Sequence, residues 1–398
     1  MPAILLDISR TISRAPHPHP TGIDRVERAY IQHFLAAGTP VFFLSRVLKG
    51  YVLLDKPTMQ TLWPMITGAA PWQNQDMIAR LFSHKLPEAT NRAESTLRRH
   101  ALGSCVHPQL AKMLARHLSA GFTYLNIGHS NRKPALWQAM RKAGAGQMLA
   151  MVHDVIPLDY PEFTRPDTAA RFEFELKATA TACDGLIYNS EDTATRTEKY
   201  LQKWSLSPAA LPILLGTEPL PAPPEAPLAS PAEFVILGTI EPRKNHEILL
   251  DIWPDIQAHL HIIGQRGWQN EAVFRSLDSH PMMGKTVFEH NNLSDHALAK
   301  RLASARALLF PSFAEGFGYP LIEALQMRLP VICADLPCFH EIAGDLPIYL
   351  RPDDKPAWKS AIQAAAASPR EKMPQIVSFP TWDQHFAKLD MFLYNDQN

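Results

Sequence analysis

The sequence has no excess of either charge, few cysteines and no long apolar run. Its 39 basic residues are balanced by 39 acidic ones, whereas nucleic-acid-binding domains are usually clearly basic, so we expect no nucleic-acid partner. The four cysteines, Cys105, Cys183, Cys333 and Cys338, show no CxxC spacing. This pattern argues against a disulfide framework or a zinc site and favours reduced thiols in a cytosolic protein.

Sequence features of membrane proteins are also missing. No stretch reaches the ~18 apolar residues that a membrane-spanning helix needs. The first residues, MPAILLD, lack the basic start and the cleavage site of a signal peptide. We therefore expect a cytoplasmic protein. A peripheral contact with the inner face of a membrane is one explanation for the excess of basic over acidic residues between Arg80 and Arg116, and a solvated helical surface is the other.

The length indicates two domains, because 398 residues exceed the usual size of a single hydrophobic core. In the second half, short apolar runs alternate with helical patterns. The predicted strands are 234–237, 260–263, 286–288, 307–310 and 331–333, and the predicted helices are 245–253, 271–277, 295–305 and 320–327. Strands separated by helices imply a parallel sheet that is covered on both faces.

The first half shows the same alternation in a weaker form. Its predicted strands are 3–6, 41–43, 124–127, 148–152 and 186–188, and its predicted helices are 23–36, 134–143, 168–182 and 192–204. We interpret residues 50–105 as a helical insertion. The proline-rich stretch 212–231 predicts a linker. The predicted boundaries are therefore a first domain over 1–211, a second domain over 232–377 and a terminal helix over 378–398.

This organisation predicts an α/β fold with two Rossmann-like domains facing each other. Such sheets bind ligands outside the carboxyl ends of their strands. With two facing sheets, this position is the cleft between the domains.

Two glutamates mark one side of the predicted cleft. Glu315 and Glu323 stand eight positions apart in PSFAEGFGYPLIEAL, in a loop that leaves the strand predicted at 307–310. Pro320 suits the start of a helix, which places Glu323 in its first turn. Taken alone, Glu315 has the ordinary explanation of a solvated loop acid, and Glu323 that of an acid favoured by the helix dipole.

The residues between the two glutamates suit an anionic ligand. Gly316 and Gly318, which flank Phe317, let backbone N–H groups approach a ligand, and the N-terminus of the following helix favours phosphate. We therefore predict a nucleotide-sugar site, with Glu315 on the sugar hydroxyls and Glu323 on the ribose hydroxyls.

A second motif follows the first strand of the second domain. In GTIEPRKNH (238–246), Arg243 and Lys244 come directly before a predicted helix. Cations at a helix N-terminus oppose its dipole, so an anion should offset them. A pyrophosphate would do so, because the arginine can bind it through two parallel N–H groups and the lysine through a single compact charge. Two solvated surface cations are the alternative.

These motifs, together with HIIGQRGW (261–268) and HDVIPLDYPEF (153–163), resemble family 4 retaining glycosyltransferases of the GT-B fold. The resemblance covers most of the chain and is strongest from Leu149 to Asp345. PTGIDRVE (20–27) and YLNIGHS (124–130) are similar to bacterial members that build surface polysaccharides. The resemblance implies a nucleotide-sugar donor, transfer with retained anomeric configuration, no metal or other cofactor, and a terminal helix that crosses back onto the first domain.

The resemblance also implies a role for individual residues. The implied catalytic residues are His153, Glu315, Arg243 and Lys244, and the two cations would stabilise the departing phosphate. The implied donor-binding residues are Gly22, Gly238, Thr239, Arg243, Lys244, Gly316, Phe317, Gly318 and Glu323. The implied acceptor-binding residues are Asp24, Arg25, His129 and Asp154, although capping of a helix is an alternative role for Asp24.

Two positions depart from the family pattern. Thr239 stands where many members carry an arginine, and Gly22 stands alone where many carry a glycine pair. The first departure leaves Arg243 to supply the missing charge.

The sequence thus predicts a hexosyltransferase that moves a sugar from a nucleotide-diphosphate donor to a growing glycan or a lipid-linked acceptor in polysaccharide biosynthesis. GDP-mannose is the leading donor, because the EPRKN form resembles mannosyltransferases. Two alternatives stay open at this point. One is a glycoside hydrolase that uses Glu315 and Glu323 as paired carboxylates. The other is a nucleotide-sugar-binding protein without catalysis.

Overall fold

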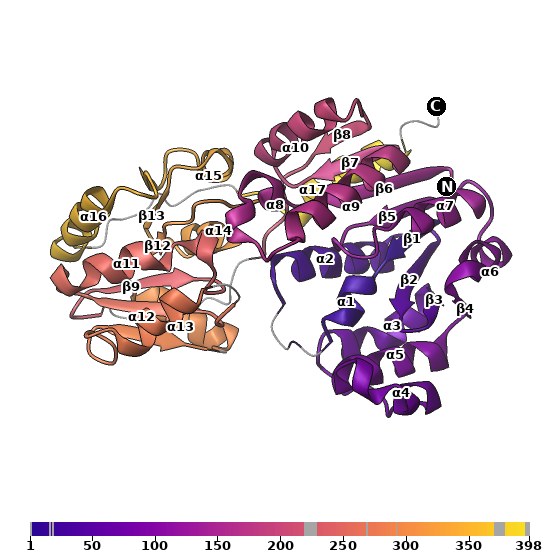
Figure 1. Cartoon of the computed structure of the whole chain (residues 1–398), viewed down its shortest axis with the longest axis horizontal. Helices are drawn as coiled ribbons and strands as arrows, with labels where there is room; N and C mark the ends of the chain where they lie inside the picture. Colours follow the sequence, from indigo (N-terminus) through magenta and orange to yellow (C-terminus); the bar gives the residue numbers. More distant parts are fainter. Residues whose placement is uncertain are drawn as a thin grey trace.

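A computed structural model describes residues 2–15, 17, 20–218, 229–267, 270–291, 293–369 and 379–394. The chain forms two α/β halves, each built around its own sheet (Figure 1). The predicted fold class of two Rossmann-like domains is confirmed. No helix in the described ranges is long and apolar enough to span a bilayer.

The first half contains a sheet with the strand order β4-β3-β2-β1-β5-β6-β7-β8. β3 pairs antiparallel with β2 and β4, and the other pairs are parallel. All five strands predicted for this half are present. The strands are β1 (Ile4–Asp7), β2 (Val41–Val47), β3 (Gly50–Asp55), β4 (Gly103–Val106), β5 (Thr123–Asn126), β6 (Gln147–Val152), β7 (Gly185–Tyr188) and β8 (Ala209–Pro212).

Helices cover this sheet, and α2 illustrates why they form. Thr21 and Asp24 make a reciprocal capping box at its start, and Val26, Tyr30 and Phe34 recur at helical spacing on its buried face. The α-helices of this half are α1 (Ser9–Ser13), α2 (Gly22–Ala36), α3 (Lys56–Ile66), α4 (Met77–Leu81), α5 (Glu88–His100), α6 (Leu110–His117), α7 (Pro134–Lys142), α8 (Ile156–Asp159), α9 (Thr168–Ala182) and α10 (Glu191–Lys203).

The second half contains a fully parallel sheet with the order β11-β10-β9-β12-β13-β14. All strands and helices predicted for this half are present, and β14, α15 and α16 were not predicted. The elements are β9 (Glu233–Leu237), α11 (His246–Ile252), β10 (His259–Ile263), α12 (Glu271–Ser279), β11 (Val287–His290), α13 (Asp295–Ser304), β12 (Ala307–Phe310), α14 (Tyr319–Gln326), β13 (Val331–Ala334), α15 (Pro337–Ala343), β14 (Ile348–Leu350) and α16 (Lys355–Ala367).

The prediction of a helical insertion over residues 50–105 is wrong in part, because β3 and β4 extend the first sheet. Only Leu48 and Lys49 separate β2 from β3, so the chain folds back as a hairpin. A β-carbon at Gly50 would collide with the backbone carbonyl of Cys105 on β4. A glycine at this position therefore permits the close pairing of the two strands.

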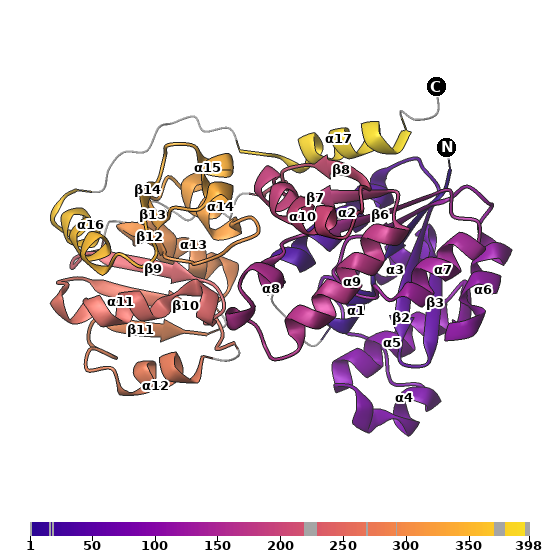
Figure 2. The same cartoon turned by 45° about the horizontal axis from the view of Figure 1, so that its top comes forward.

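A final helix, α17 (Trp382–Tyr394), crosses back onto the first half (Figure 2). Tyr30 Oη lies 2.8 Å from His385 Nε2, and the ring of His33 stacks on Phe386 at 3.9 Å. Residues 219–228 of the predicted linker and residues 370–378 before this helix lie outside the described ranges.

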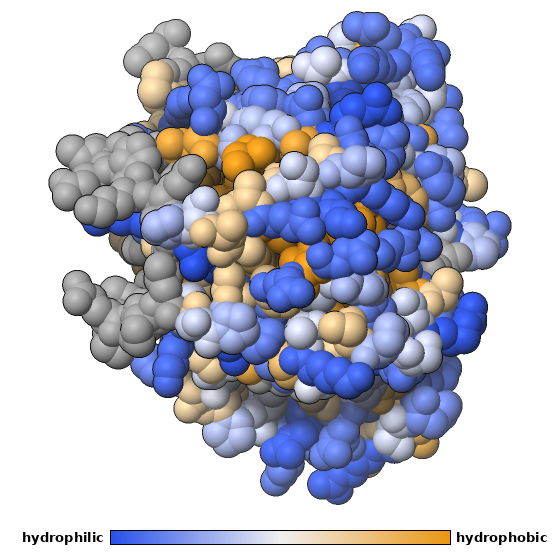
Figure 3. Space-filling model, turned by 90° about the vertical axis from the view of Figure 1, so that its left-hand side faces the viewer, coloured by the Kyte–Doolittle hydropathy of each residue, from blue (hydrophilic) through white to orange (hydrophobic). Residues whose placement is uncertain are grey.

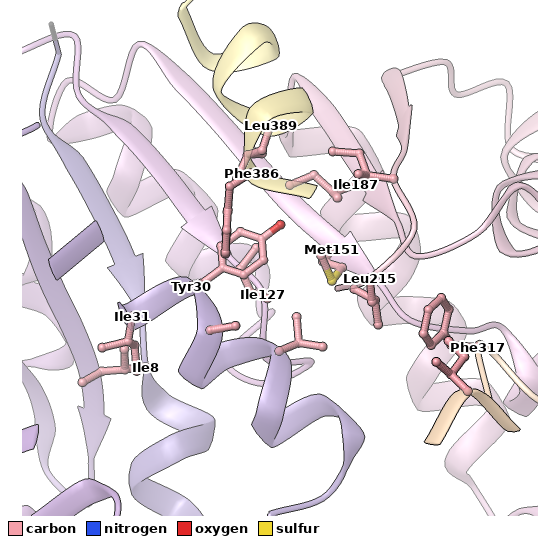
Figure 4. Close-up of a cluster of buried hydrophobic side chains, with 14 of the residues drawn as sticks. Ile8, Tyr30, Ile31, Ile127, Met151, Ile187, Leu215, Phe317, Phe386 and Leu389 are labelled. Carbon is pink, nitrogen blue, oxygen red and sulfur yellow. The ribbon is translucent and has the colours of Figure 1, made fainter. Parts of the chain in front are cut away.

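One buried apolar cluster continues from the first half into the second. It runs from Tyr30 and Phe386 past Met151 and Leu215 to Phe317, which belongs to the glutamate loop (Figure 4). Because Phe317 belongs to this cluster, the loop between the two glutamates is anchored where the halves meet. The opposite end of the second half, remote from the first, has a mainly hydrophilic surface with smaller hydrophobic areas (Figure 3).

Candidate active site

The glutamate loop connects β12 to α14. Gly318 adopts φ 111°, a conformation that favours glycine, immediately before the helix begins at Tyr319. Because the helix begins one residue before Pro320, Glu323 is its fifth residue and lies in the second turn. The prediction of a first-turn position for Glu323 is therefore wrong. Both Glu315 and Glu323 are buried.

Glu315 lies between two cations. One carboxylate oxygen is 2.6 Å from Lys244 Nζ, and the other is 2.8 Å from Arg243 Nη1. Burial by itself would raise the pKa of Glu315, but the positive charges of Arg243 and Lys244 outweigh it and lower this pKa to about 2. Glu315 is therefore ionised at neutral pH and cannot donate a proton there.

The two cations come from the turn before α11. Gly238, with φ 129°, leaves space for the lysine, since a β-carbon there would lie 3.3 Å from Lys244 Cε. Arg243 also pairs with Glu241 at 2.6 Å and donates to the carbonyl of Ala314 at 3.0 Å. Glu241 and Glu315 therefore supply negative charge beside the two cations within the protein itself. That a pyrophosphate also offsets them stays a prediction.

Thr239 lies next to this turn, and its methyl group packs under Gly267, where a β-carbon would come within 2.7 Å of it. It supplies no charge. Arg243 is therefore the arginine that this loop offers in place of the one expected at position 239.

The first half contributes His153, which follows β6. We call this side of the site the opposite wall, because it lies across from the glutamate loop of the second half. The ring is buried, and its Nε2 lies 2.7 Å from the carbonyl oxygen of Ile127. Burial lowers the pKa of His153 to about 3, so the ring is neutral at pH 7. A carbonyl can only accept, so Nε2 carries the proton and Nδ1 is left as an acceptor.

The neighbours of His153 have structural contacts of their own. The backbone N–H of His153 donates to His129 Nε2 at 3.1 Å, and burial lowers the pKa of His129 well below its usual value. The Asp154 carboxylate accepts from the N–H of Ile156 at 3.1 Å, and burial raises the pKa of Asp154. The structure thus brings His129, His153 and Asp154 together on the first half.

The two walls touch at Gly316. A β-carbon at this position would collide with the carbonyl oxygen of His153. The hydroxyls of Ser190 and Thr193, at the start of α10, donate to the carbonyl of Gly316 at 3.3 and 3.2 Å. Glycine is therefore required at this contact, and the contact brings Glu315 and His153 into one site.

The predicted acceptor residues at the start of α2 point in different directions. Asp24 accepts from Arg10 at 2.8 Å and from the N–H of Thr21 at 2.8 Å, as a helix-capping residue does. Arg25 instead pairs with Glu323 of the second half. Gly22 packs against the ring of Tyr319. The structure thus joins Gly22 and Arg25 to the donor-side loop and leaves Asp24 outside it.

A cavity of about 410 Å³ opens beside Glu315, between the two halves. Several of its lining residues were missed by sequence reasoning, because the helix predicted over 192–204 and the DY of HDVIPLDY carried no assigned role. The missed residues are Asp159, Tyr160, Asp192, Arg196, Lys199, Phe313, Leu336, Pro337 and Cys338. Charged groups and aromatic rings in one concave site suit a polar small molecule.

The described residues contain a single group of side chains with the spacing of metal ligands, and it lies away from this site. Glu233, His259 and His261 bring their ligand atoms within 4.8 Å of one another on β9 and β10. Arg301 already supplies a cation there, since its Nη1 lies 2.9 Å from Glu233 Oε2 and 3.4 Å from His261 Nε2.

Comparisons with known proteins agree with the motifs. Residues 224–375 match the family described as glycosyl transferases group 1. The serotype-specific mannosyltransferase WbdA of Escherichia coli is 35% identical over 228 residues, which cover 52% of this chain and 28% of that protein. The O-antigen chain mannosyltransferase RfbU of Salmonella typhimurium LT2 is 31% identical over 160 residues, covering 39% and 43% of the two chains. The matches thus span less than half of these relatives.

Solved structures share the whole fold. Sucrose-phosphate synthase from Thermosynechococcus elongatus aligns with a TM-score of 0.66 at 18% identity, over 100% of this chain and 99% of that one. HepE of Anabaena, in complex with UDP-glucose, aligns with a TM-score of 0.63 at 14% identity, over 99% and 100% of the chains. At such identities the likeness concerns the fold, and it confirms the expected GT-B architecture.

Proposed function

We propose that this chain, a glycosyltransferase of the bacterial family 4 type, moves a sugar from a nucleotide-diphosphate donor to a glycan or lipid-linked acceptor in polysaccharide biosynthesis. The observation that carries the proposal is the ionic group of the buried Lys244 and Glu315 with the half-buried Arg243, placed against His153 at the carboxyl ends of both sheets. Two cations held in a water-poor site suit a departing diphosphate.

Mannose from GDP-mannose is the proposed donor. The EPRKN form of the phosphate loop favours it, and the relatives named above are described as mannosyltransferases. The matched region covers less than half of each relative, so the acceptor and the linkage are proposed only as a class, a growing saccharide.

The proposed mechanism keeps the anomeric configuration and uses no metal. Negative charge builds on the diphosphate as the glycosyl bond breaks, and Arg243 and Lys244 offset it in place of a metal ion. Glu315 holds both cations in position. His153 carries its proton on Nε2 and accepts a hydrogen bond at Nδ1 from a hydroxyl of the donor sugar. Its neutral ring adds no charge beside the positive charge that develops on the sugar.

The two alternatives have less support. A hydrolase with paired carboxylates needs one carboxyl group that is protonated near neutral pH. The pKa of Glu315 is lowered to about 2, and Glu323 is paired with Arg25. A binding protein without catalysis could use the same cations, so the turnover experiment below separates it from the enzyme.

The test is turnover. The protein is incubated with GDP-mannose, UDP-glucose and other nucleotide sugars, with and without lipid-linked saccharides, and free nucleotide diphosphate is measured. Release that depends on the acceptor is expected for one donor. Binding of a nucleotide sugar without release, with every acceptor tried, would favour the binding protein.

We also propose a peripheral membrane contact through α4. Met77 and Leu81 are 85% and 72% exposed there, and Arg80 lies between them. Apolar side chains beside a base suit an anionic lipid surface. Co-sedimentation with phosphatidylglycerol vesicles should fall in Met77→Ser/Leu81→Ser and stay unchanged in Met391→Ser, which alters an exposed methionine on α17. Equal sedimentation of all three proteins would contradict the contact.

A further inference from the structure

A single ion pair joins the first turn of α2 to the helix that follows the glutamate loop. Arg25 Nη1 donates to Glu323 Oε1. The guanidinium of Arg25 also lies 5.7 Å from the centroid of the Tyr319 ring, and a β-carbon at Gly22 would lie 3.1 Å from that ring. The start of α2 therefore packs on the start of α14.

The two partners of this ion pair are unequal. The Arg25 side chain keeps 36% of its surface exposed, whereas that of Glu323 keeps 7%. Within the described ranges, no other ion pair to Glu323 is present. The arginine can therefore move into solvent, but its departure would leave a buried carboxylate unpaired, which is costly unless other donors replace it.

The ribose of a nucleotide offers such donors. Its two neighbouring hydroxyls can each donate a hydrogen bond, and an ionised carboxylate only accepts. Glu323 is the proposed ribose ligand, so Arg25 and the donor compete for the same oxygens.

Asp24, the acid next to Arg25, does not take over the released arginine. Its carboxylate is already engaged by Arg10 at 2.8 Å and by Arg14 at 3.3 Å. Asp295, at the start of α13, is close enough to act on Arg25 through its charge, but the two make no ion pair within the described ranges. A released Arg25 can therefore meet an anion of the ligand. The diphosphate is that anion, because a guanidinium binds phosphate oxygens through two parallel N–H groups.

We propose that Arg25 is a donor-site residue that holds Glu323 until the ribose displaces it and that then binds the donor diphosphate. The inference rests on the proposed function and moves Arg25 from the acceptor side to the donor side. It gives Arg25 two opposing effects on binding. Arg25 reduces the binding free energy gained from the ribose hydroxyls, and it increases the binding free energy gained from the diphosphate.

The two effects can be separated by calorimetric titration. GDP, UDP and their 2′,3′-dideoxy analogues are titrated into the wild type and into Arg25→Met, together with guanosine and uridine. The hydroxyl preference is the ratio of the Kd of the dideoxy analogue to the Kd of the natural diphosphate. Arg25→Met removes the competitor, so the hydroxyl preference should rise by about threefold to tenfold. The preference for the diphosphate over the nucleoside should fall.

Two further variants complete the experiment. Arg28→Met removes an arginine from the same helix, one that donates to the carbonyl of Ile66 at 3.1 Å, and should leave both preferences unchanged. Arg25→Lys keeps the positive charge but loses the two parallel N–H groups of the guanidinium. It should change both preferences in the same directions by smaller factors. This variant also keeps the inference testable if Arg25→Met fails to fold. A hydroxyl preference that stays unchanged or falls in the Arg25 variants overturns the inference. If neither diphosphate binds the wild type, the proposed function fails and the inference fails with it.

Discussion

The two walls of the site differ in how their polar groups are balanced. On the second half, the half-buried Arg243 and the buried Lys244 both form ion pairs with the buried Glu315. On the first half, burial keeps His129 and His153 neutral, and both make hydrogen bonds with backbone groups. Under the proposed function, the difference corresponds to a division of roles, in which the charged side stabilises the leaving group and the neutral side positions the sugar.

The largest effect is expected from removing one cation of the charged wall. In Lys244→Met, the diphosphate loses a point charge in a buried site, and Glu315 keeps only Arg243. We expect kcat to fall by about 10²- to 10³-fold. Steady-state release of nucleotide diphosphate measures it. Lys300→Met, which alters an exposed lysine on α13, is the matched control and should keep wild-type activity.

A smaller and divided effect is expected from the two glutamates. Glu315→Gln disturbs the position of both cations, whose contacts strengthen as charge develops, so kcat should fall by about 10²-fold. Glu323→Gln weakens a ribose contact that is similar before and during transfer, so it should mainly raise KM for the donor.

The different effects expected for the two glutamine variants distinguish a glycosyltransferase from a glycoside hydrolase. Melting temperatures of both glutamine variants exclude a folding defect. Equal losses of kcat in both variants, with a bell-shaped pH profile, would remove the contrast and favour an acid–base pair of carboxylates.

The neutral wall should be visible in the pH dependence of stability. The pKa of His153 is lowered by burial to about 3, so the unfolded chain binds more protons at this group below about pH 6.5. His153 should therefore lower the free energy of unfolding by about 2 kcal/mol as the pH falls from 7 to 5, whereas Glu27, whose pKa burial raises to about 8, acts in the opposite direction.

Urea unfolding at the two pH values measures this loss. His153→Gln should show a smaller loss than the wild type, and His84→Gln, which alters an exposed histidine remote from the cleft, should show the same loss. A pH dependence of stability that is the same in His153→Gln as in the wild type would contradict the neutral assignment of His153.

Much of the fold was predictable, because the signal is local. Strands such as 307–310 (ALLF) are short apolar runs between helical patterns, and α9 occupies the predicted 168–182. β3 and β4 were missed because they run antiparallel at one edge of the sheet, where β4 has only four residues and alternating exposure. Their pairing depends on Gly50, whose close approach to Cys105 concerns residues far apart in the sequence.

The site was predictable in its members but not in their pairing. The motifs identified Glu315, Arg243 and Lys244, yet nothing local indicates that the glutamate neutralises both cations across 71 residues. The Arg25–Glu323 pair spans 298 residues, and neither α2 nor α14 shows it in its own pattern. The first contact forms when two loops of the second half come together, and the second forms when the two halves meet.

The smallest effect is expected from removing metal ions, which should leave activity unchanged. Because Arg243 and Lys244 carry the charge that a metal ion would otherwise supply, treatment with EDTA should leave kcat and KM unchanged. EDTA should also leave the melting temperature unchanged, because Arg301 already supplies a cation to the group around Glu233. Melting temperature is therefore recorded beside activity.

The most direct measurement is the rate of nucleotide diphosphate release from the active donor after exhaustive dialysis against EDTA, compared with the rate after addition of Mg²⁺ or Mn²⁺. The account predicts equal rates, together with a loss of about 10²-fold or more in Lys244→Met under both conditions. Loss of activity on chelation, with recovery on adding the metal ion, would contradict the central claim that buried side-chain cations stabilise the leaving group.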